Sequence, residues 1–268
     1  MLDRFNREIY YLRISITDRC NLRCKYCMPE EGIELKSHNQ ILRYEQIIEI
    51  VKASSELGFK KIRITGGEPL VRKGVENLVK DIKEINGIEE VSLTTNGVLL
   101  KFMAKKLKDS GLDRINISLD TLNPDKYRDI TRIGDIRFVL EGIEETIKVG
   151  FKNTKINMVL IPGFNDNEVE DLKRFCESKG LKLQRINHYS LNDINSIKKN
   201  YKAERPLPCS KCNRIRLTAD GYLKPCLFSN LLIKVDFNDI KSSIIRAIKE
   251  KPAAGTFNTT MYNYQIGG

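Results

Sequence analysis

Short runs rich in Ile, Val and Leu alternate with amphipathic segments through the first 190 residues, and this alternation limits the fold more than any other feature. Six runs have the length of buried strands, at residues 12–17, 61–65, 91–95, 114–119, 155–161 and 181–187. Segments with helical periodicity are found at 43–57, 74–86, 99–110, 136–149 and 167–179. Such alternation predicts a parallel sheet with right-handed crossovers. We therefore expect an α/β fold, a partial (βα)6-type TIM barrel with its chemistry at the carboxyl ends of the strands.

The pattern changes after about residue 190, where Asn, Lys and Ser accumulate and two prolines follow, Pro206 and Pro208. The remaining sequence predicts a short strand at 215–218 and a helix at 239–250. We expect two parts, a barrel over residues 1–190 and a C-terminal extension with an auxiliary cluster over residues 191–268.

Composition narrows the function classes. The 268 residues are 41% hydrophobic, without a run of about 18 apolar residues and without a basic and apolar secretory start, so we expect no membrane contact and a cytoplasmic location. The net charge of +11 favours an anionic partner, although most such charge lies on solvated surface. Seven cysteines are an odd number, which opposes a complete disulfide framework and favours metal or redox chemistry.

Three cysteines follow the first expected strand in a C-x3-C-x2-C arrangement: Cys20, Cys24 and Cys27. Three thiolates hold three corners of a [4Fe-4S] cluster and leave one iron open to a small molecule. A structural zinc site is the alternative, but zinc usually takes four protein ligands, and no histidine is nearby. Cys176 stands apart on the apolar face of a predicted helix, so we interpret it as a buried structural cysteine.

A second group, Cys209, Cys212 and Cys226, forms C-x2-C-x13-C, again without an obvious fourth ligand. If the run after Cys212 is a strand, Arg214 and Arg216 point to the same side, because side chains alternate. Two guanidiniums beside an open iron would suit a phosphorylated substrate. A zinc knuckle with an unseen fourth ligand is the alternative.

The first cysteine group, with a tyrosine before its last member, resembles the radical S-adenosylmethionine (SAM) signature, and TGGEP at 65–69 is similar to the GGEP element of that superfamily. The resemblance implies that SAM completes the first cluster and is split reductively into methionine and a deoxyadenosyl radical. The positions that match SAM contacts are Tyr26, Gly66, Gly67, Glu68 and Ser118.

Nearly the whole chain resembles the MoaA family, the GTP 3′,8-cyclases of molybdenum cofactor biosynthesis. The match is carried by LRISITDRCNLRCKYCMP, IRITGGEPL, TTNG, NISLDTL, CNRIRLTADGYLKPCLF and a terminal Gly-Gly. It implies that the guanine base of GTP binds at a second [4Fe-4S] cluster. The deoxyadenosyl radical would remove the ribose 3′ hydrogen, and the carbon radical would attack C8.

The resemblance also implies roles for single residues. Positions that match GTP contacts are Arg13, Arg63, Thr94, Lys155, Arg214, Ile215 and Arg216. Positions that match catalytic residues are Arg13, Arg214, Arg216, Gly267 and Gly268, the last two as a tail that reaches the active site. Tyr189 stands where the family has a methionine that contacts SAM, and Asp120 and Asn96 end strands that face the expected site. Implied partners are a reductant protein and a downstream pterin-forming synthase, and a homodimer is one assembly that the resemblance allows.

Two other functions stay open. A radical SAM enzyme that modifies a peptide would also carry C-terminal clusters, generally on more than three cysteines, and the paired arginines and the diglycine end favour a nucleotide instead. An iron–sulfur or zinc-ribbon protein that binds nucleic acid would use the charge of +11 and would bind less tightly as salt rises. It leaves the first cysteine group beside GGEP unexplained, so we expect no nucleic-acid partner.

Overall fold

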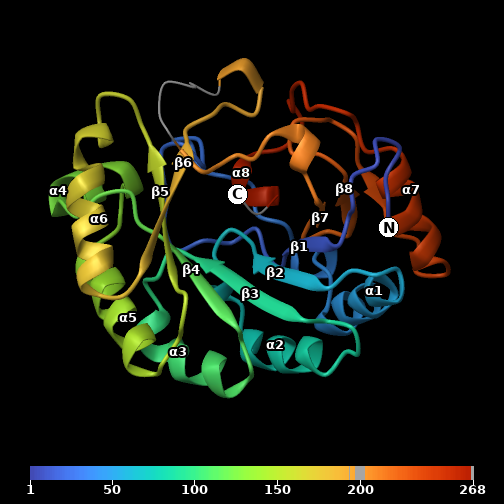
Figure 1. Cartoon of the computed structure of the whole chain (residues 1–268), viewed down its shortest axis with the longest axis horizontal. Helices are drawn as coiled ribbons and strands as arrows, with labels where there is room; N and C mark the ends of the chain where they lie inside the picture. Colours follow the sequence, from blue (N-terminus) through green and yellow to red (C-terminus); the bar gives the residue numbers. More distant parts are fainter. Residues whose placement is uncertain (193, 197–202, 267–268) are drawn as a thin grey trace.

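The computed structural model describes residues 1–192, 194–196 and 203–266, in which nine strands form one sheet in the order β6-β5-β4-β3-β2-β1-β7-β8-β9. The first six strands are β1 Tyr11–Ser15, β2 Lys61–Thr65, β3 Glu90–Thr95, β4 Arg114–Ser118, β5 Lys155–Leu160 and β6 Lys182–Asn187. They lie side by side in sequence order and pair in parallel, as the alternation predicted. The sheet curves into a barrel that does not close (Figure 1).

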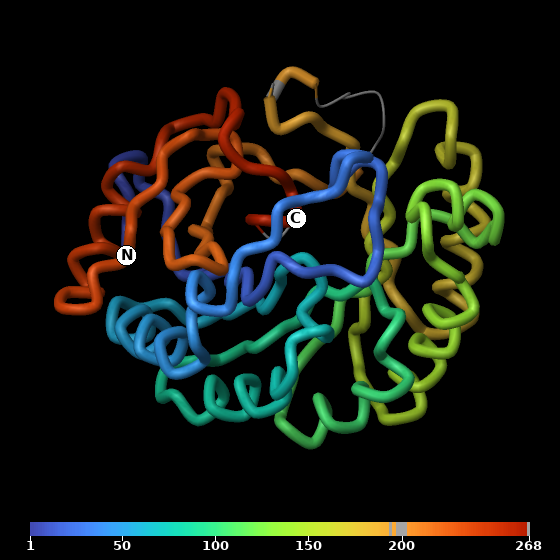
Figure 2. Tube along the Cα trace, turned by 180° about the vertical axis from the view of Figure 1, so that it is seen from behind, coloured from blue at the N-terminus to red at the C-terminus, as the bar shows by residue number. Residues whose placement is uncertain are grey.

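Helices cover the convex side of the sheet, and both views show them around its outside (Figures 1 and 2). They are α1 Tyr44–Glu56, α2 Val75–Lys83, α3 Leu100–Asp109, α4 Pro124–Thr131, α5 Ile136–Lys148, α6 Val169–Ser178 and α7 Ile240–Lys249. A last turn, α8 Asn263–Ile266, lies instead within the curve of the sheet (Figure 1).

Each strand has an apolar face and a polar face. In β1, Leu12 and Ile14 are fully buried in the main core cluster, whereas Tyr11 and Arg13 point to the concave side. The same alternation continues through β2 to β5, because successive side chains of a strand point to opposite faces. The apolar face therefore makes the core with the helices, and the polar face lines the hollow of the barrel.

The C-terminal region continues this sheet. Strand β7 (Arg214–Leu217) pairs in parallel with β1, and β8 (Tyr222–Lys224) and β9 (Ile233–Lys234) add antiparallel strands beyond it. The boundary at residue 190 stays a prediction, and part of the connection that follows it is outside the described residues.

Two strands and two helices were not predicted from the sequence. Strands β8 and β9 have only three and two residues, too few for a periodicity to show. Helix α4 had a recognisable start, since the Asn123 side chain accepts hydrogen bonds from the amides of Asp125 and Lys126, and Pro124 occupies the first turn. The single turn of α8 was not expected either, and it buries Tyr264 and Ile266.

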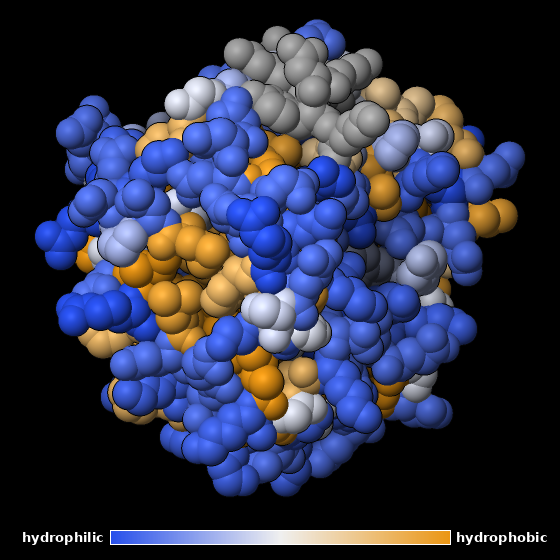
Figure 3. Space-filling model, turned by 60° about the vertical axis from the view of Figure 1, so that its left-hand side comes forward, coloured by the Kyte–Doolittle hydropathy of each residue, from blue (hydrophilic) through white to orange (hydrophobic). Residues whose placement is uncertain are grey.

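The outer surface is mainly hydrophilic. Figure 3 shows one face on which hydrophilic residues dominate and hydrophobic ones gather in a limited area. Among the described helices, none has the length and apolar character needed to cross a membrane.

Candidate active site

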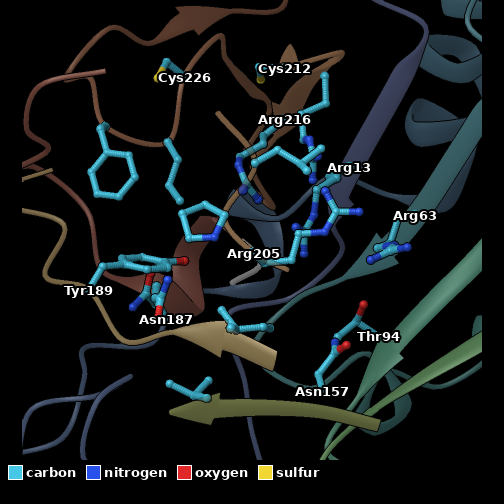
Figure 4. A pocket seen from close by; sticks show the side chains of 18 of the residues that line it. Arg13, Arg63, Thr94, Asn157, Asn187, Tyr189, Arg205, Cys212, Arg216 and Cys226 are labelled. Carbon is cyan, nitrogen blue, oxygen red and sulfur yellow. The ribbon is translucent and has the colours of Figure 1, made fainter. Parts of the chain in front are cut away.

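The concave side of the sheet holds a cavity of about 290 Å³ whose lining comes from both ends of the chain. Its described lining residues include six cationic side chains and no Asp or Glu: Arg13, Arg63, Arg205, Arg214, Arg216 and Lys251. Figure 4 shows Arg13, Arg63, Arg205 and Arg216 converging on one part of the cavity, with Cys212 and Cys226 at its border. A concave site with charges of one sign concentrates ligands of the opposite sign. The cavity therefore suits a polyanion.

Two of these arginines are buried side by side. Arg13 of β1 and Arg216 of β7 are 8% and 6% exposed, and they are register partners in the sheet. Burial, followed by the charge of Arg216, lowers the pKa of Arg13 well below its ordinary value, and burial also lowers the pKa of Arg216. Two like charges in a weakly polar site disfavour each other, so an anion between them would stabilise both.

An aromatic ring separates the next pair of cations. The guanidinium carbons of Arg63 and Arg214 lie 5.6 and 5.3 Å from the ring centroid of Tyr11. The Arg63 Nε also donates a hydrogen bond to Ser92 Oγ at 3.2 Å. The cation–π attraction partly offsets the repulsion between the two arginines and orients both toward the cavity.

The other positions that match GTP contacts are placed unequally. Thr94 lines the cavity, and its Oγ1 is buried without a hydrogen-bond partner among the described residues. Lys155, at the start of β5, lies just outside the lining and donates to Gln184 Oε1 at 3.4 Å. The side chain of Ile215 is fully buried in the core on the opposite face of β7, so only its main chain can face the site.

The end of the chain enters the same cavity. Arg216 Nη1 donates to the carbonyl of Ile266 at 3.3 Å, and Asn263 lines the cavity wall. Gly267 and Gly268, for which the sequence predicted a catalytic position, lie outside the described residues.

The first cysteine group occupies the loop after β1, and its three thiols are held close to one another. Burial raises the pKa of Cys20 to about 11 and that of Cys27 to about 12. Burial, followed by Cys27, raises the pKa of Cys24 well above its ordinary value. Adjacent thiolates repel each other, so a positively charged centre bound by all three would favour their ionised form. Thiolate ligands of this kind fit an iron–sulfur cluster.

The zinc alternatives need side chains gathered tightly about one ion. In the part of the chain that the structure describes, no three His, Cys, Asp or Glu side chains are arranged to hold a single metal ion.

The two glycines of TGGEP are explained by a close backbone contact. A Cβ atom at Gly67 would lie 2.4 Å from the carbonyl oxygen of Arg19, and one at Gly66 would lie 2.9 Å from that of Thr17. The Gly67 amide donates to Thr17 O at 2.7 Å, and the Glu68 amide donates to Arg19 O at 2.8 Å. Only residues without a Cβ fit here, so these glycines fix the segment that leads into Cys20.

Glu68, the acidic residue of TGGEP, is buried and accepts several hydrogen bonds. The Glu68 side chain is almost fully buried, with the residue only 1% exposed. It accepts hydrogen bonds from Leu70 N, Thr95 Oγ1 and Asn96 N. Asn96 Nδ2 in turn lies 3.8 Å from Cys20 Sγ and donates toward it. Glu68 therefore links the loop after β3 to the first cysteine group.

A second buried acid holds the tyrosine of the cysteine motif. Tyr26 Oη donates to Asp120 Oδ2 at 2.9 Å, and the Val159 amide donates to Asp120 Oδ1 at 2.8 Å. Burial raises the pKa of Asp120 to about 6. Tyr26, Ser118 and Tyr189 all line the cavity, and Tyr189 packs edge-on against Phe228, with the ring centroids 5.3 Å apart.

A buried lysine joins the loops of the second cysteine group. Lys251 is 1% exposed, and its Nζ donates to the carbonyls of Arg214 at 2.9 Å and Pro225 at 2.5 Å. Burial would raise the pKa of Cys212, but the Lys251 ammonium opposes it, and the net pKa is lowered. Sequence reasoning missed this lysine, because no motif marks it.

A buried arginine from the other end of the chain holds the same region. Arg7 Nε pairs with Asp3 Oδ2 at 2.6 Å, while its Nη1 donates to Cys209 O at 2.9 Å. Arg7 also donates to the carbonyls of Pro252 and Ala253 at 2.6 and 2.8 Å. The first residues accordingly lie beside the C-terminal region in both views (Figures 1 and 2).

Comparison with known proteins gives a consistent result. Residues 14–176, more than half of the chain, match the Radical SAM superfamily. The GTP 3′,8-cyclase of Petrotoga mobilis is 40% identical, with 96% of this chain and 95% of that protein covered. Those of Alkaliphilus metalliredigens and Peptoclostridium acidaminophilum are 44% and 41% identical, covering 86% and 100% of this chain and 84% and 98% of theirs.

Solved structures share the fold at low identity. Streptococcus suis SuiB bound to S-adenosylmethionine has a TM-score of 0.63 at 19% identity, over 82% of this chain and 60% of SuiB. Native anSMEcpe with bound AdoMet has a TM-score of 0.63 at 18% identity, over 91% of this chain and 81% of that protein.

Proposed function

Since the chain belongs to the radical SAM superfamily and, within it, to the GTP 3′,8-cyclases, we propose that it converts GTP to (8S)-3′,8-cyclo-7,8-dihydroguanosine 5′-triphosphate, the first step of molybdenum cofactor biosynthesis. The observation that carries this proposal is the cationic cavity bordered by cysteines of both groups. The likeness to SuiB, whose structure was solved with a bound precursor peptide, concerns the fold alone.

SAM and an iron–sulfur cluster are the cofactors of this superfamily, and Cys20, Cys24 and Cys27 are the residues to hold the cluster. When bound, they supply a carbon radical that removes a hydrogen atom from the substrate. Residues 66–68 fix the loop that carries Cys20. In this proposal the same residues, together with Tyr26 and Ser118 of the cavity lining, orient SAM.

In this proposal Cys209, Cys212 and Cys226 hold a second [4Fe-4S] cluster, with one iron open to the guanine base. Lys251 supports that role, because its ammonium opposes the rise that burial causes in the pKa of Cys212 and Cys226. The net pKa is lowered for Cys212 and raised for Cys226.

The substrate phosphates carry about four negative charges, which arginine forks hold through paired hydrogen bonds. The residues assigned to GTP are Arg13, Arg63, Thr94, Lys155, Arg214, Arg216 and the main chain of Ile215. Arg13, Arg214, Arg216 and the Gly267–Gly268 tail stay proposed as catalytic. The hydrogen bond from Arg216 to the carbonyl of Ile266 supports this role for the tail, because Ile266 directly precedes Gly267 and its carbonyl contacts a residue of the cavity lining.

The proposal includes a reductant protein, because the superfamily's reaction begins with an electron from outside. It also includes a pterin-forming synthase that takes the product, a cytoplasmic location that keeps the thiols reduced, a homodimer, and the division into residues 1–190 and 191–268.

The test is an anaerobic incubation of reconstituted protein with GTP, SAM and dithionite, followed by mass spectrometry. We expect cyclised GTP and deoxyadenosine, and neither from the Cys27→Ala variant. Deoxyadenosine formed equally well without GTP, with no cyclic product, would contradict the choice of substrate.

A further inference from the structure

The segment after the connection lies along the outer edge of β6 and fixes the backbone of Arg205. Ile186 and Arg205 form a parallel bridge. The Arg205 amide donates to Arg185 O at 3.2 Å, and the Asn187 amide donates to Arg205 O at 2.9 Å. Next to it, the Glu204 carboxylate pairs with the Arg185 guanidinium at 2.5 Å and accepts from the Arg185 amide at 2.6 Å. Arg205 is thus presented by a backbone held at several points.

The side chain of Arg205 enters the cavity and lacks an anion. It is part of the cavity lining, on the side where Arg13 and Arg63 also point (Figure 4). Among the described residues, its Nη1 is buried and has no hydrogen-bond partner. The neighbouring carboxylate of Glu204 is already paired with Arg185. A buried guanidinium nitrogen without an acceptor costs free energy that a bound anion recovers.

The surroundings of Arg205 are rich in positive charge. Burial lowers the pKa of Arg205, and the charges of Arg214 and Arg63 lower it further. Arg205 and Arg63 likewise contribute to lowering the pKa of Lys155, after burial and Arg114. Arg63 and Arg205 share the cavity lining, and Lys155, just outside it, is near enough for both charges to act on it.

We propose that Arg205 binds the polyphosphate of the substrate nucleotide and makes the enzyme prefer a triphosphate over a monophosphate. This inference rests on the proposed function. A planar guanidinium can hold two phosphate oxygens at once, and a backbone fixed on β6 keeps it in position before the ligand arrives. Sequence analysis did not single out Arg205, because it stands in a polar connection without a motif.

The test compares binding of GTP, GDP and GMP to anaerobically reconstituted holoprotein by calorimetry. We expect Arg205→Gln to weaken GTP binding at least about tenfold and GMP binding less than about twofold, since a charged hydrogen bond contributes about 1.5–3 kcal/mol. Arg205→Lys keeps the charge without the planar fork and should show an intermediate loss for GTP. Arg137→Gln is the matched control, because Arg137 is exposed and pairs with Asp135 on the outer surface. Iron content and thermal unfolding of each variant show whether the fold is intact.

Two outcomes would overturn the inference. One is an unchanged GTP affinity in both Arg205 variants, and the other is an equal loss for GTP and GMP. If Arg205→Gln does not fold, Arg205→Lys alone decides. Inorganic triphosphate is the probe that separates the two proposals. A wild-type protein that binds triphosphate through Arg205 but does not bind GTP would contradict the proposed function and leave the role of Arg205 standing.

Discussion

Arg13 of β1 and Arg216 of β7 face the same cavity as register partners in adjacent parallel strands, both buried and both cationic. The two like charges lie side by side in a buried site, where burial and the charge of Arg216 lower the pKa of Arg13 and burial lowers that of Arg216. A bound polyanion is therefore expected to stabilise the fold as well as occupy the site.

The first prediction concerns that stabilisation. Inorganic triphosphate at 100 times its dissociation constant should raise the free energy of unfolding by about 2.7 kcal/mol. At one fixed concentration the gain should fall as salt rises, and it should be smaller in Arg216→Gln than in wild type. Urea unfolding with and without triphosphate measures this gain in the free energy of unfolding. The same gain in Arg216→Gln and in the exposed control Arg137→Gln would show that the arginine pair does not bind the anion.

The second prediction separates the two cysteine groups. Cys27→Ala and Cys212→Ala should each lose about half of the iron, because each removes a ligand from one of two four-iron clusters. Cys212→Ala should still cleave SAM, whereas Cys27→Ala should not. Iron and sulfide analysis, with electron paramagnetic resonance, measures the loss. Cys176→Ala is the control, since Cys176 is buried in the core away from both groups, and it should keep all its iron. Full iron in Cys212→Ala would exclude the second cluster.

The third prediction is a pH dependence that originates at Glu68. Burial raises the pKa of this carboxyl from 4.5 to about 7. Its folded-state pKa is above its unfolded value, so its contribution to stability is fully present below about pH 4.5 and is lost as the pH rises through about 7. Between pH 5.5 and 8, the free energy of unfolding should fall by about 2 kcal/mol more in wild type than in Glu68→Gln.

Urea unfolding of the metal-free protein at both pH values measures this difference. Glu49→Gln, an exposed position on α1, should follow the wild-type profile. If the free energy of unfolding varies with pH in the same way in wild type and in Glu68→Gln, the pKa of Glu68 is not raised. The Glu68 carboxyl would then be less buried than the structure indicates.

The fourth prediction concerns the pair of Asp3 and Arg7. Arg7→Met removes the charged partner of the buried Asp3 carboxylate and the donor to three carbonyls, so the free energy of unfolding should fall by about 3–5 kcal/mol. Asp3→Asn combined with Arg7→Met should recover part of the loss, because it removes the uncompensated charge. Arg4→Met, at an exposed neighbour, should change it by less than about 0.5 kcal/mol. A loss in Arg7→Met no larger than in Arg4→Met would contradict this role.

The sequence predicted the barrel well because its strands are buried parallel strands. Runs such as 61–65 and 114–119 keep apolar side chains toward the helices, and that pattern is visible in one dimension. The cysteine groups and the paired arginines were equally visible, since each lies within one short segment. β7 was expected at 215–218 and forms one residue earlier, which leaves its arginines on the predicted common face.

What was missed depends on contacts between distant segments. Arg7 and Cys209 are 202 positions apart in the chain, and no local sequence pattern predicts the hydrogen bond between them. Arg205 became a cavity residue only because its segment docks on β6, and Lys251 only because α7 ends beside the second cysteine group. Glu68 was recognised by its motif, but its three donors come from Leu70 and from Thr95 and Asn96 near the end of β3, which a motif does not reveal.

The pairing of β1 with β7 has a consequence for any shortened version of the chain. A fragment that stopped at residue 190 would lose β7, and β1 would present a row of unsatisfied amides and carbonyls along its full length. Such a fragment should recruit strands from other molecules and precipitate, even though it would retain all six strands of the barrel and the first cysteine group. The last third of the molecule thus acts as a cover that keeps the barrel from self-association.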